Sequence, residues 1–312
     1  MRQFLGAFLC GLGWLMLVSC QSNPPAAPEL ETASARTPGV SVAPASSTPT
    51  SATLATATAR PISTQAAPLV TIVPTPNIQP AEVLCPSDND EAIDLYNDGT
   101  SLAADGKTEQ AIAAFLQAIE LDPGYCDAMD NLGLALRRQG EIEEAIKWYE
   151  RSLQIKPDNV VAHVNLAVAY SLQGETDKAL EEYQLLVKIA PDDPEGYYGL
   201  GTTYLSLQRP AEAIPYLKKA EELYAQTASP WIVDARFQLG FAYFRSKDYQ
   251  QALDYLKLVY AQMPDDPEVN YLLGLCYLAP QTEDVAQAKE YLSKARDLGR
   301  TLSPELLQLL NK

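Results

Sequence analysis

A 34-residue period occupies the C-terminal two thirds of this 312-residue chain and limits what the chain can fold into. Each period repeats a small residue, then an alanine, then a large residue four places after the alanine, and in several periods a closing proline. The small residues are Gly99, Gly133, Ala167, Gly201, Gly240 and Gly274; the alanines are Ala111, Ala145, Ala179, Ala213, Ala252 and Ala288; the large residues are Phe115, Tyr149, Tyr183, Leu217, Leu256 and Leu292; the prolines are Pro123, Pro157 and Pro191. Such repetition predicts a stack of similar units and not one globular core.

Each unit is predicted to consist of two helices that pack against each other. The small residue permits their close approach, and the large residue shares a helical face with the alanine four places before it. A proline after the second helix cannot extend that helix and therefore marks the end of the unit. Because one pair of helices cannot cover its own apolar face, the units are expected to stack on their neighbours.

These positions resemble the signature of the tetratricopeptide repeat (TPR), in which W-x2-L-G-x2-Y is followed by A-x3-F and then by proline. The resemblance implies an all-α fold, a right-handed superhelix (α-solenoid) of about six helix–turn–helix repeats. The repeats are placed at about 92–125, 126–159, 160–193, 194–232, 233–266 and 267–302, within a repeat domain of residues 86–302. Ser303 and Pro304 are typical of an N-cap and a first helical residue, so residues 303–312 are predicted to form a capping helix.

The fourth repeat departs from the pattern. It has Ala225 where the closing proline is expected, and Gln226 to Pro230 are about five extra residues. Pro215 falls inside its second helix, where a missing N–H bends a helix. These irregularities predict a slight break in the stack between the fourth and fifth repeats.

The N-terminus reads as an export signal. Arg2 precedes an uncharged, mostly apolar run from Phe4 to Val18, which is short for a membrane-spanning helix and typical of a signal-peptide core. Leu17-Val18-Ser19-Cys20 resembles the bacterial lipobox, which implies a lipoprotein signal peptide at residues 1–19 and a diacylglyceryl group on Cys20. The alternative is an uncleaved N-terminal anchor with a coincidental cysteine. Both place the rest of the chain outside the cytoplasm, tethered to a bacterial membrane.

Residues 20–85 are predicted to be a disordered linker. Proline, threonine, alanine and serine dominate this segment, and residues 21–84 contain no phenylalanine, tryptophan or tyrosine. Such a composition cannot bury enough apolar surface to offset the entropy lost on ordering.

Residues suited to catalysis are scarce in the sequence. The single histidine, His163, lies in the third repeat at a position where TPRs keep a packed side chain, so a structural role is expected. No glycine-rich phosphate loop, metal-ligand spacing or nucleophile with a partner base is found, so neither an enzyme nor a cofactor is predicted. The net charge of −17 disfavours nucleic acid and direct contact with anionic lipid, and it fits either simple solubility or a basic partner.

Two cysteines are candidates for a disulfide. Cys85 precedes the first predicted helix and Cys126 begins the first helix of the second repeat, and these helix starts are neighbours in a TPR stack. A Cys85–Cys126 bond is therefore a hypothesis, whereas Cys276 is expected to be a small buried residue.

In the TPR family the first helices of successive repeats line a concave groove that binds extended peptides or helices. The resemblance places eight residues there as candidate partner contacts: Asn97, Asn131 and Asn165 in the first three repeats, and Tyr198, Phe237, Phe241, Phe244 and Tyr271 in the last three. Asparagine amides can bind a peptide backbone, but asparagine is also common at this position of the repeat itself. The phenylalanines form one helical stripe, which is either groove lining or interhelical core.

The leading hypothesis is a membrane-tethered scaffold or adaptor that binds a protein or peptide partner in this groove, in cell-envelope assembly or secretion. The alternative is a glycan or small-ligand receptor that uses the aromatic side chains of repeats four to six as stacking platforms. The sequence does not identify the partner.

Overall fold

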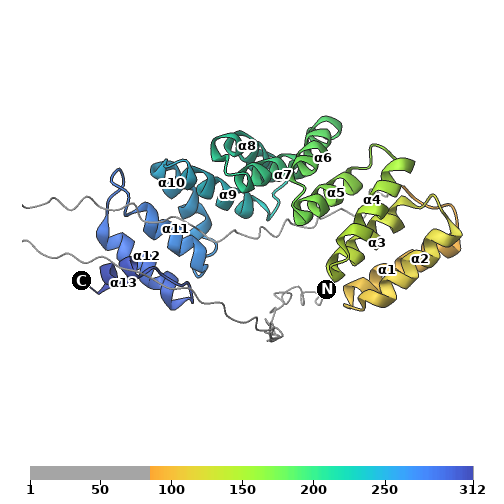
Figure 1. Cartoon of the computed structure of the whole chain (residues 1–312), viewed down its shortest axis with the longest axis horizontal. Helices are drawn as coiled ribbons and strands as arrows, with labels where there is room; N and C mark the ends of the chain where they lie inside the picture. The colour runs from red at the N-terminus through yellow and green to blue at the C-terminus, as the bar shows by residue number, and fades with distance from the viewer. Residues whose placement is uncertain (1–84, 312) are drawn as a thin grey trace, which may run out of the picture. The chain divides into compact units, whose positions relative to one another are not determined.

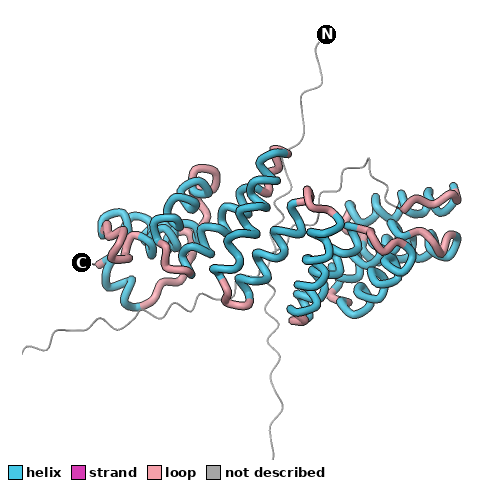
Figure 2. The backbone as a smooth tube through the Cα atoms, turned by 90° about the horizontal axis from the view of Figure 1, so that it is seen from above, coloured by secondary structure: helices cyan, strands magenta, loops and turns pink. Residues whose placement is uncertain are grey.

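The computed structural model describes residues 85–311, and every regular element in that range is an α-helix (Figures 1 and 2). The thirteen helices of this range are α1 (Asp90–Ala104), α2 (Thr108–Leu121), α3 (Cys126–Gln139), α4 (Ile142–Ile155), α5 (Val160–Gln173), α6 (Thr176–Ile189), α7 (Pro194–Ser206), α8 (Pro210–Gln226), α9 (Ile232–Arg245), α10 (Tyr249–Tyr260), α11 (Pro267–Cys276), α12 (Val285–Asp297) and α13 (Pro304–Leu310). The predicted signal peptide, Cys20 and the linker up to residue 84 lie outside the described residues.

Helices α1 to α12 pair in chain order into six helical hairpins, which we call units one to six. The first helices of neighbouring units contact one another: α1 with α3, α3 with α5, α5 with α7, α7 with α9, and α9 with α11. Between residues 85 and 311 no second helix contacts another second helix. The first helices are therefore closer to one another than the second helices are. We call the surface of the first helices that points away from the second helices the inner face. The predicted all-α solenoid is confirmed.

In the five units that have a glycine as the small residue, this glycine sits directly beneath the large residue of the second helix. A Cβ added to Gly133 would lie 2.5 Å from Cε1 of Tyr149, and one added to Gly99 would lie 2.6 Å from the equivalent atom of Phe115. The side chain of Tyr149 is fully buried, so its ring has no free space to move into. Close contact between the two helices is thus a property of the repeat, as its period predicts.

Substitution of Gly133 by alanine is expected to lower the free energy of unfolding by about 2 kcal/mol, because overpacking a closed site costs roughly 1–3 kcal/mol. Urea unfolding of the purified chain measures this change. The reverse change, Ala167→Gly at the equivalent position of unit three, is expected to cost about 1–2 kcal/mol, because it adds backbone freedom and removes a fully buried methyl group. A Gly133→Ala variant as stable as the wild type would contradict this packing.

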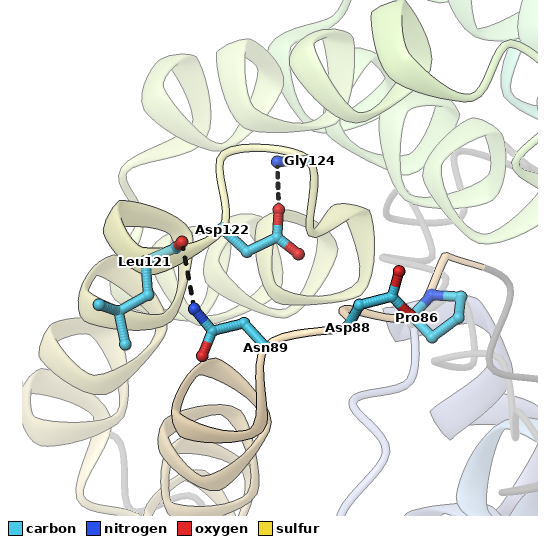
Figure 3. Close-up of a pocket in the computed structure, with 6 residues that line it drawn as sticks. All are labelled: Pro86, Asp88, Asn89, Leu121, Asp122 and Gly124. Atoms are coloured by element: carbon cyan, nitrogen blue, oxygen red, sulfur yellow. Dashed lines mark hydrogen bonds between the residues drawn. The ribbon is translucent and has the colours of Figure 1, made fainter.

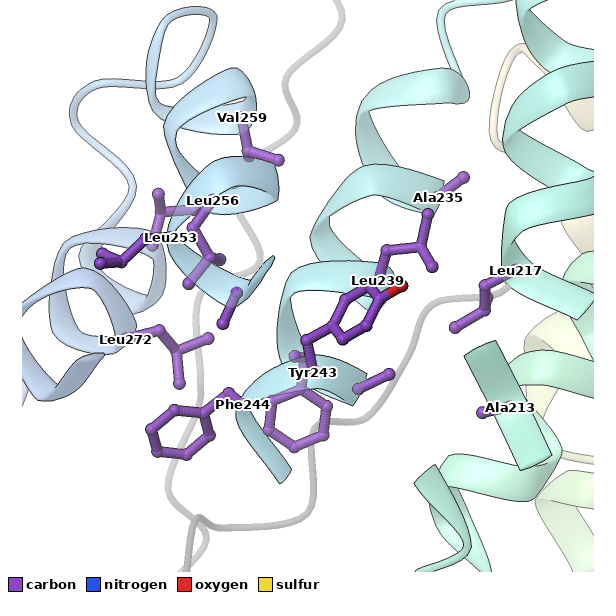
Figure 4. Packing of buried hydrophobic residues seen from close by; sticks show 14 of the residues in the cluster. Ala213, Leu217, Ala235, Leu239, Tyr243, Phe244, Leu253, Leu256, Val259 and Leu272 are labelled. Atoms are coloured by element: carbon purple, nitrogen blue, oxygen red, sulfur yellow. The ribbon is translucent and has the colours of Figure 1, made fainter. Parts of the chain in front are cut away.

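Units four and five share a continuous core, and the predicted break between them is wrong. One cluster of buried side chains reaches from Tyr198 in α7 to Cys276 in α11, and Leu217 of α8 lies in it with Leu239 of α9 (Figure 4). The extra residues lengthen α8 to 17 residues, and Pro215 lies within that continuous helix. The insertion is thus absorbed by the helix and its following turn without opening the core.

The last unit is covered by α13. Leu302 and Leu306 pack with Leu292 of α12, and the side chain of Ser303 accepts a hydrogen bond from the backbone N–H of Leu306. Terminal units of a solenoid need such a cover because no further unit buries their apolar face. Among the described residues, no helix is long and apolar enough to cross a membrane.

A disulfide joins Cys85 to Cys126, with the Cα atoms 5.3 Å apart. The bond connects the segment before α1 to the start of α3, so it encloses the whole of unit one. The third cysteine of this region, Cys276, is a free buried thiol in α11.

Candidate protein-binding surface

Polar side chains fix where several first helices begin. Asn159 accepts hydrogen bonds from the backbone N–H groups at the start of α5, at 3.1 and 3.4 Å, and Asp266 does the same for α11 at 2.9 and 2.8 Å. Asn89 and Asp193 cap α1 and α7 in the same way. Such caps accept hydrogen bonds from backbone N–H groups that have no acceptor within the helix, and they set the first residue of the helix. The caps therefore fix where each of these first helices begins, and the contacts between first helices of neighbouring units bring successive helices side by side.

The predicted asparagine ladder is used mainly within the array. The amide of Asn131 donates to the hydroxyl of Tyr96 at 3.1 Å, which ties α3 to α1. The side chain of Asn165 is 3% exposed and accepts a hydrogen bond from Arg137 at 3.3 Å, which ties α5 to α3. A partner cannot reach Asn165, so its assignment as a contact residue is corrected. Of the three asparagines, only Asn97 is exposed.

Three of the five aromatic candidates belong to the core. Tyr198 is 1% exposed, and its ring meets that of Tyr224 edge-on at 6.2 Å. Phe241 and Phe244 are each 8% exposed and lie in the cluster shared by units four to six. The physical reason is that these side chains lie in the core between helices, where Tyr198 meets Tyr224 of α8 and Phe244 meets Tyr249 of α10. Their prediction as partner contacts is therefore corrected.

The other two aromatic candidates are half-buried. Phe237 packs against the edge of the same cluster. Tyr271 has the guanidinium of Arg300 over its ring at 4.5 Å, and Arg300 forms an ion pair with Glu268 at 2.8 Å. Both aromatic residues therefore offer a partner only part of their surface.

Other side chains of the first helices remain accessible. Those that are half-buried or exposed include Thr100, Leu134, Arg138, Leu172 and Thr202. Leu172 is 56% exposed, the largest fraction among the exposed large hydrophobic side chains of the described chain. An accessible mixture of apolar, hydroxyl and basic groups is suited to protein contact.

His163 is packed between units two and three. It is 4% exposed; Nδ1 lies 2.6 Å from a carboxylate oxygen of Glu182 in α6, and Nε2 lies 2.9 Å from the carbonyl oxygen of Pro157. Burial lowers the pKa of His163, but the hydrogen bonds with Glu182 and Pro157 raise it above its usual value. Both ring nitrogens face acceptors, so the protonated ring satisfies both of them. The expected structural role agrees with this placement.

A buried carboxyl group lies in the same region. Asp130 of α3 is 3% exposed and accepts a hydrogen bond from Asn159 at 2.7 Å, and the same amide also donates to Ser152 at 2.9 Å. Burial raises the pKa of Asp130 to about 7. These side chains connect α3, α4 and the start of α5, and they are closed to substrate. The network is therefore structural.

One surface pocket lies beside the disulfide, lined by Pro86, Asp88, Asn89, Leu121, Asp122 and Gly124 (Figure 3). Asp122 accepts hydrogen bonds from Ser87 at 2.5 Å and from the backbone of Gly124 at 2.9 Å, so its carboxylate is committed to the loop. Asn89 donates to the carbonyl oxygen of Leu121 at 3.5 Å. The hydrogen bonds around the pocket thus hold the segment before α1 against the loop between α2 and α3. In residues 85–311 no group of three or more histidine, cysteine or acidic residues is placed to hold a metal ion.

Three family models match the repeats. One, described as TPR repeat, matches residues 99–140, 133–174 and 172–208; two others, described as tetratricopeptide repeat, match residues 192–265 and 243–312. Together they cover residues 99–312. The chain carries tetratricopeptide repeats. No curated protein matches the sequence.

Solved TPR structures share the fold. A chain of the APC/C hetero-tetramer Cut9–Hcn1 is 21% identical with a TM-score of 0.59, over 71% of this chain and 42% of that one. PilF of Pseudomonas aeruginosa is 18% identical with a TM-score of 0.61, over 71% of this chain and 97% of that one. YrrB, described as a TPR protein with an unusual peptide-binding site, is 25% identical with a TM-score of 0.51, over 64% and 96%. The chain thus spans less than half of the Cut9–Hcn1 chain and nearly all of the other two.

Units four to six of the TPR array also contain stacked tyrosine pairs that were not predicted. Their ring centroids are 5.5 to 5.8 Å apart and their planes are nearly parallel, and the pairs are Tyr204–Tyr216, Tyr243–Tyr255 and Tyr277–Tyr291. A cation lies over the first ring of each pair, at 4.9, 5.6 and 5.5 Å, namely Arg209, Lys218 and Lys257. A spacing of twelve or fourteen residues between tyrosines is the sequence signal for these pairs.

Proposed function

We propose that this TPR protein is a scaffold or adaptor that binds a protein or peptide partner on its inner face. The observation that carries the proposal is the row of first helices, which contact one another and present accessible side chains such as Leu134 and Leu172 along one continuous surface. The described residues contribute a binding surface of this kind, and the buried groups Asp130 and His163 are engaged in packing between helices. The proposal includes no catalytic role.

The comparisons support this class of function. TPR domains in general bind proteins or peptides, and the similar structure YrrB is described as having a peptide-binding site. The Cut9–Hcn1 structure is itself a hetero-tetramer. Function within a repeat fold depends on its surface residues, so the partner of this chain has to be found by experiment.

The tyrosine pairs favour a protein partner over a glycan. A sugar stacks on a free aromatic face, but the rings of units four to six stack on one another, and cations lie over three of them. Accessible apolar and hydroxyl side chains on the inner face are the groups that protein interfaces use. These tyrosine pairs therefore do not offer the free aromatic faces that the glycan-receptor hypothesis requires.

We also propose that the array is held outside the cytoplasm by a lipid on Cys20. The apolar N-terminal run and Leu17-Val18-Ser19-Cys20 support this placement, and so does the Cys85–Cys126 disulfide, since structural disulfides persist mainly in oxidising compartments. The role in envelope assembly or secretion belongs to this proposal. The segment after Cys20 would let the array reach a partner away from the membrane.

Substitution of Cys20 by alanine is expected to abolish incorporation of labelled fatty acid and to prevent cleavage of the signal peptide, because the thiol accepts the lipid. Mass spectrometry of the mature N-terminus and fatty-acid labelling in a bacterial host measure both effects. Cys10→Ala is the matched control, and labelling is expected to persist in it. A wild-type protein that stays uncleaved and unlabelled at the membrane would instead support the anchor alternative.

Substitution of Leu134 by glutamate is expected to weaken partner binding by about tenfold, since an unpaired charge at an interface core costs at least about 1.4 kcal/mol. The assay is co-purification of the full chain with its partner from detergent-solubilised membranes, with bound protein quantified. Leu185→Glu makes the same change on α6, a second helix, where the leucine is 38% exposed, and it is expected to leave binding unchanged. Equal losses in both variants would contradict the inner face as the binding surface.

A further inference from the structure

Two arginines at the end of α3 lack the partners that arginines elsewhere in the array have. Between residues 85 and 311, neither Arg137 nor Arg138 has a carboxylate within ion-pair distance. Of the other half-buried arginines in this range, Arg236 pairs with Glu221 and Arg300 with Glu268, each at 2.8 Å. Arg151 and Arg245 have no carboxylate either, but each lies over an aromatic ring, that of Trp148 or Phe241. The chain has 40 acidic and 23 basic residues, so carboxylates are in excess, and the lack of both an ion pair and a cation–π contact sets Arg137 and Arg138 apart from the other arginines of residues 85–311.

Arg137 is positioned by the array and still has donor capacity to spare. Its Nη2 donates to Asn165 at 3.3 Å, which holds the guanidinium at the seam between α3 and α5. Its Nε is buried beside the hydroxyl of Tyr149 and is closed to a partner, so only the rest of the guanidinium is available. Guanidinium groups bind carboxylates through two parallel hydrogen bonds, and a buried donor without an acceptor is costly. Because the Arg137 side chain is only half-buried, the rest of this positioned guanidinium is suited to bind a carboxylate from another molecule.

The surroundings of the two arginines indicate the kind of partner. Arg138 follows Arg137 on α3 and is exposed. The equivalent place on the neighbouring helix α5, 34 residues on, is Leu172, which is 56% exposed. Because α3 and α5 contact each other, equivalent positions on them face the same region of the inner face. Two unpaired cations therefore lie beside an exposed apolar side chain, and arginine is enriched among residues that dominate interface energies.

We infer that the inner face of units two and three binds an acidic peptide segment, with a carboxylate on Arg137 and Arg138 and an apolar side chain on Leu172. This inference rests on the proposed function and names the chemistry of its partner. The rest of this acidic array repels an acidic segment. The two arginines would therefore decide where on the surface such a segment binds.

A random peptide library displayed on phage and selected on the full chain tests the inference. Peptides selected on the wild type are expected to be enriched in aspartate and glutamate next to an apolar residue. Selection on Arg138→Gln should lose this enrichment. The peptides selected on the wild type should bind Arg138→Gln about tenfold more weakly than they bind the wild type in fluorescence anisotropy, a change of about 1.4 kcal/mol. Because Arg138 is exposed, this variant is expected to fold normally.

Lys188→Gln removes the same charge from an exposed site on α6 and is the matched control. Unchanged binding to this variant supports the site, whereas an equal loss would show general attraction between charges and overturn it. Peptides without acidic enrichment, or no selected peptides at all, would also overturn it. If both arginines serve only to stabilise the C-terminal end of α3, Arg138→Gln will lower the melting temperature and leave peptide binding intact. That outcome would overturn this inference. It would not bear on the proposed partner-binding function, which the Leu134→Glu variant tests.

Discussion

Reduction of the Cys85–Cys126 disulfide is expected to lower the free energy of unfolding by about 4 kcal/mol in the chain-entropy model. The two cysteines are 41 residues apart, and the loop they close contains α1 and α2. Units of a solenoid contact only their neighbours, so the loss should fall mainly on unit one, which has a neighbour on one side only. Urea unfolding with and without reductant measures the total change. Hydrogen exchange should show α1 and α2 losing protection while α9 and α10 keep it.

The control for this experiment is Cys85→Ser. It should unfold like the reduced wild type and should not respond to reductant, because Cys276 is the only other cysteine in the described range and it carries no bond. If the wild type unfolds at the same urea concentration with and without reductant, the disulfide contributes nothing to unit one, and this account of its role is wrong.

The array is expected to be less stable at pH 8.5 than at pH 5.5, by about 2–4 kcal/mol, with one pKa unit corresponding to about 1.4 kcal/mol. Burial raises the pKa of Asp130 and of Glu195 to about 7 each, and the pKa of His163 is also raised above its usual value. A group whose pKa is higher in the folded state gives its full stabilisation below the unfolded pKa and loses it as the pH rises through the folded pKa. All three groups therefore act in the same direction, and so does relief of the net charge of −17 at lower pH.

Asp130→Asn is the variant that separates this cause from general charge repulsion. The amide keeps the shape of the carboxyl group and an oxygen that can accept the bond from Asn159, but it cannot ionise. The variant should be more stable than the wild type at pH 8.5, and its stability should depend less on pH. Urea unfolding across pH 5.5 to 8.5 gives both quantities. Stability that rises with pH, or an unchanged slope in the variant, would contradict the assignment.

The sequence predicted the helical hairpins because their determinants lie within one repeat. The contact of Gly133 with Tyr149 follows from two positions 16 residues apart, and the same pair recurs in other units. The continuous core between units four and five was missed because an insertion can be taken up by a longer helix, as in α8.

The accessible residues of the inner face were harder to predict because their exposure depends on neighbouring units. Phe241 and Asn165 stand at positions that the family pattern assigns to the groove, yet adjacent helices bury both. The arginine pair was missed because its distinctive property is the lack of both an ion pair and a cation–π contact. That property depends on the arrangement of α3 with α5 and is invisible in a single repeat.

The claim that the inner face binds the partner is tested most directly by photocrosslinking in cells that produce the full chain. A photoreactive amino acid is placed at Leu134 or Thr202 on first helices, and at Leu185 or Leu258 on second helices, where these leucines are 38% and 46% exposed. We expect a discrete crosslinked protein from the first two positions and none from the other two. Crosslinks from the second helices alone would contradict the account.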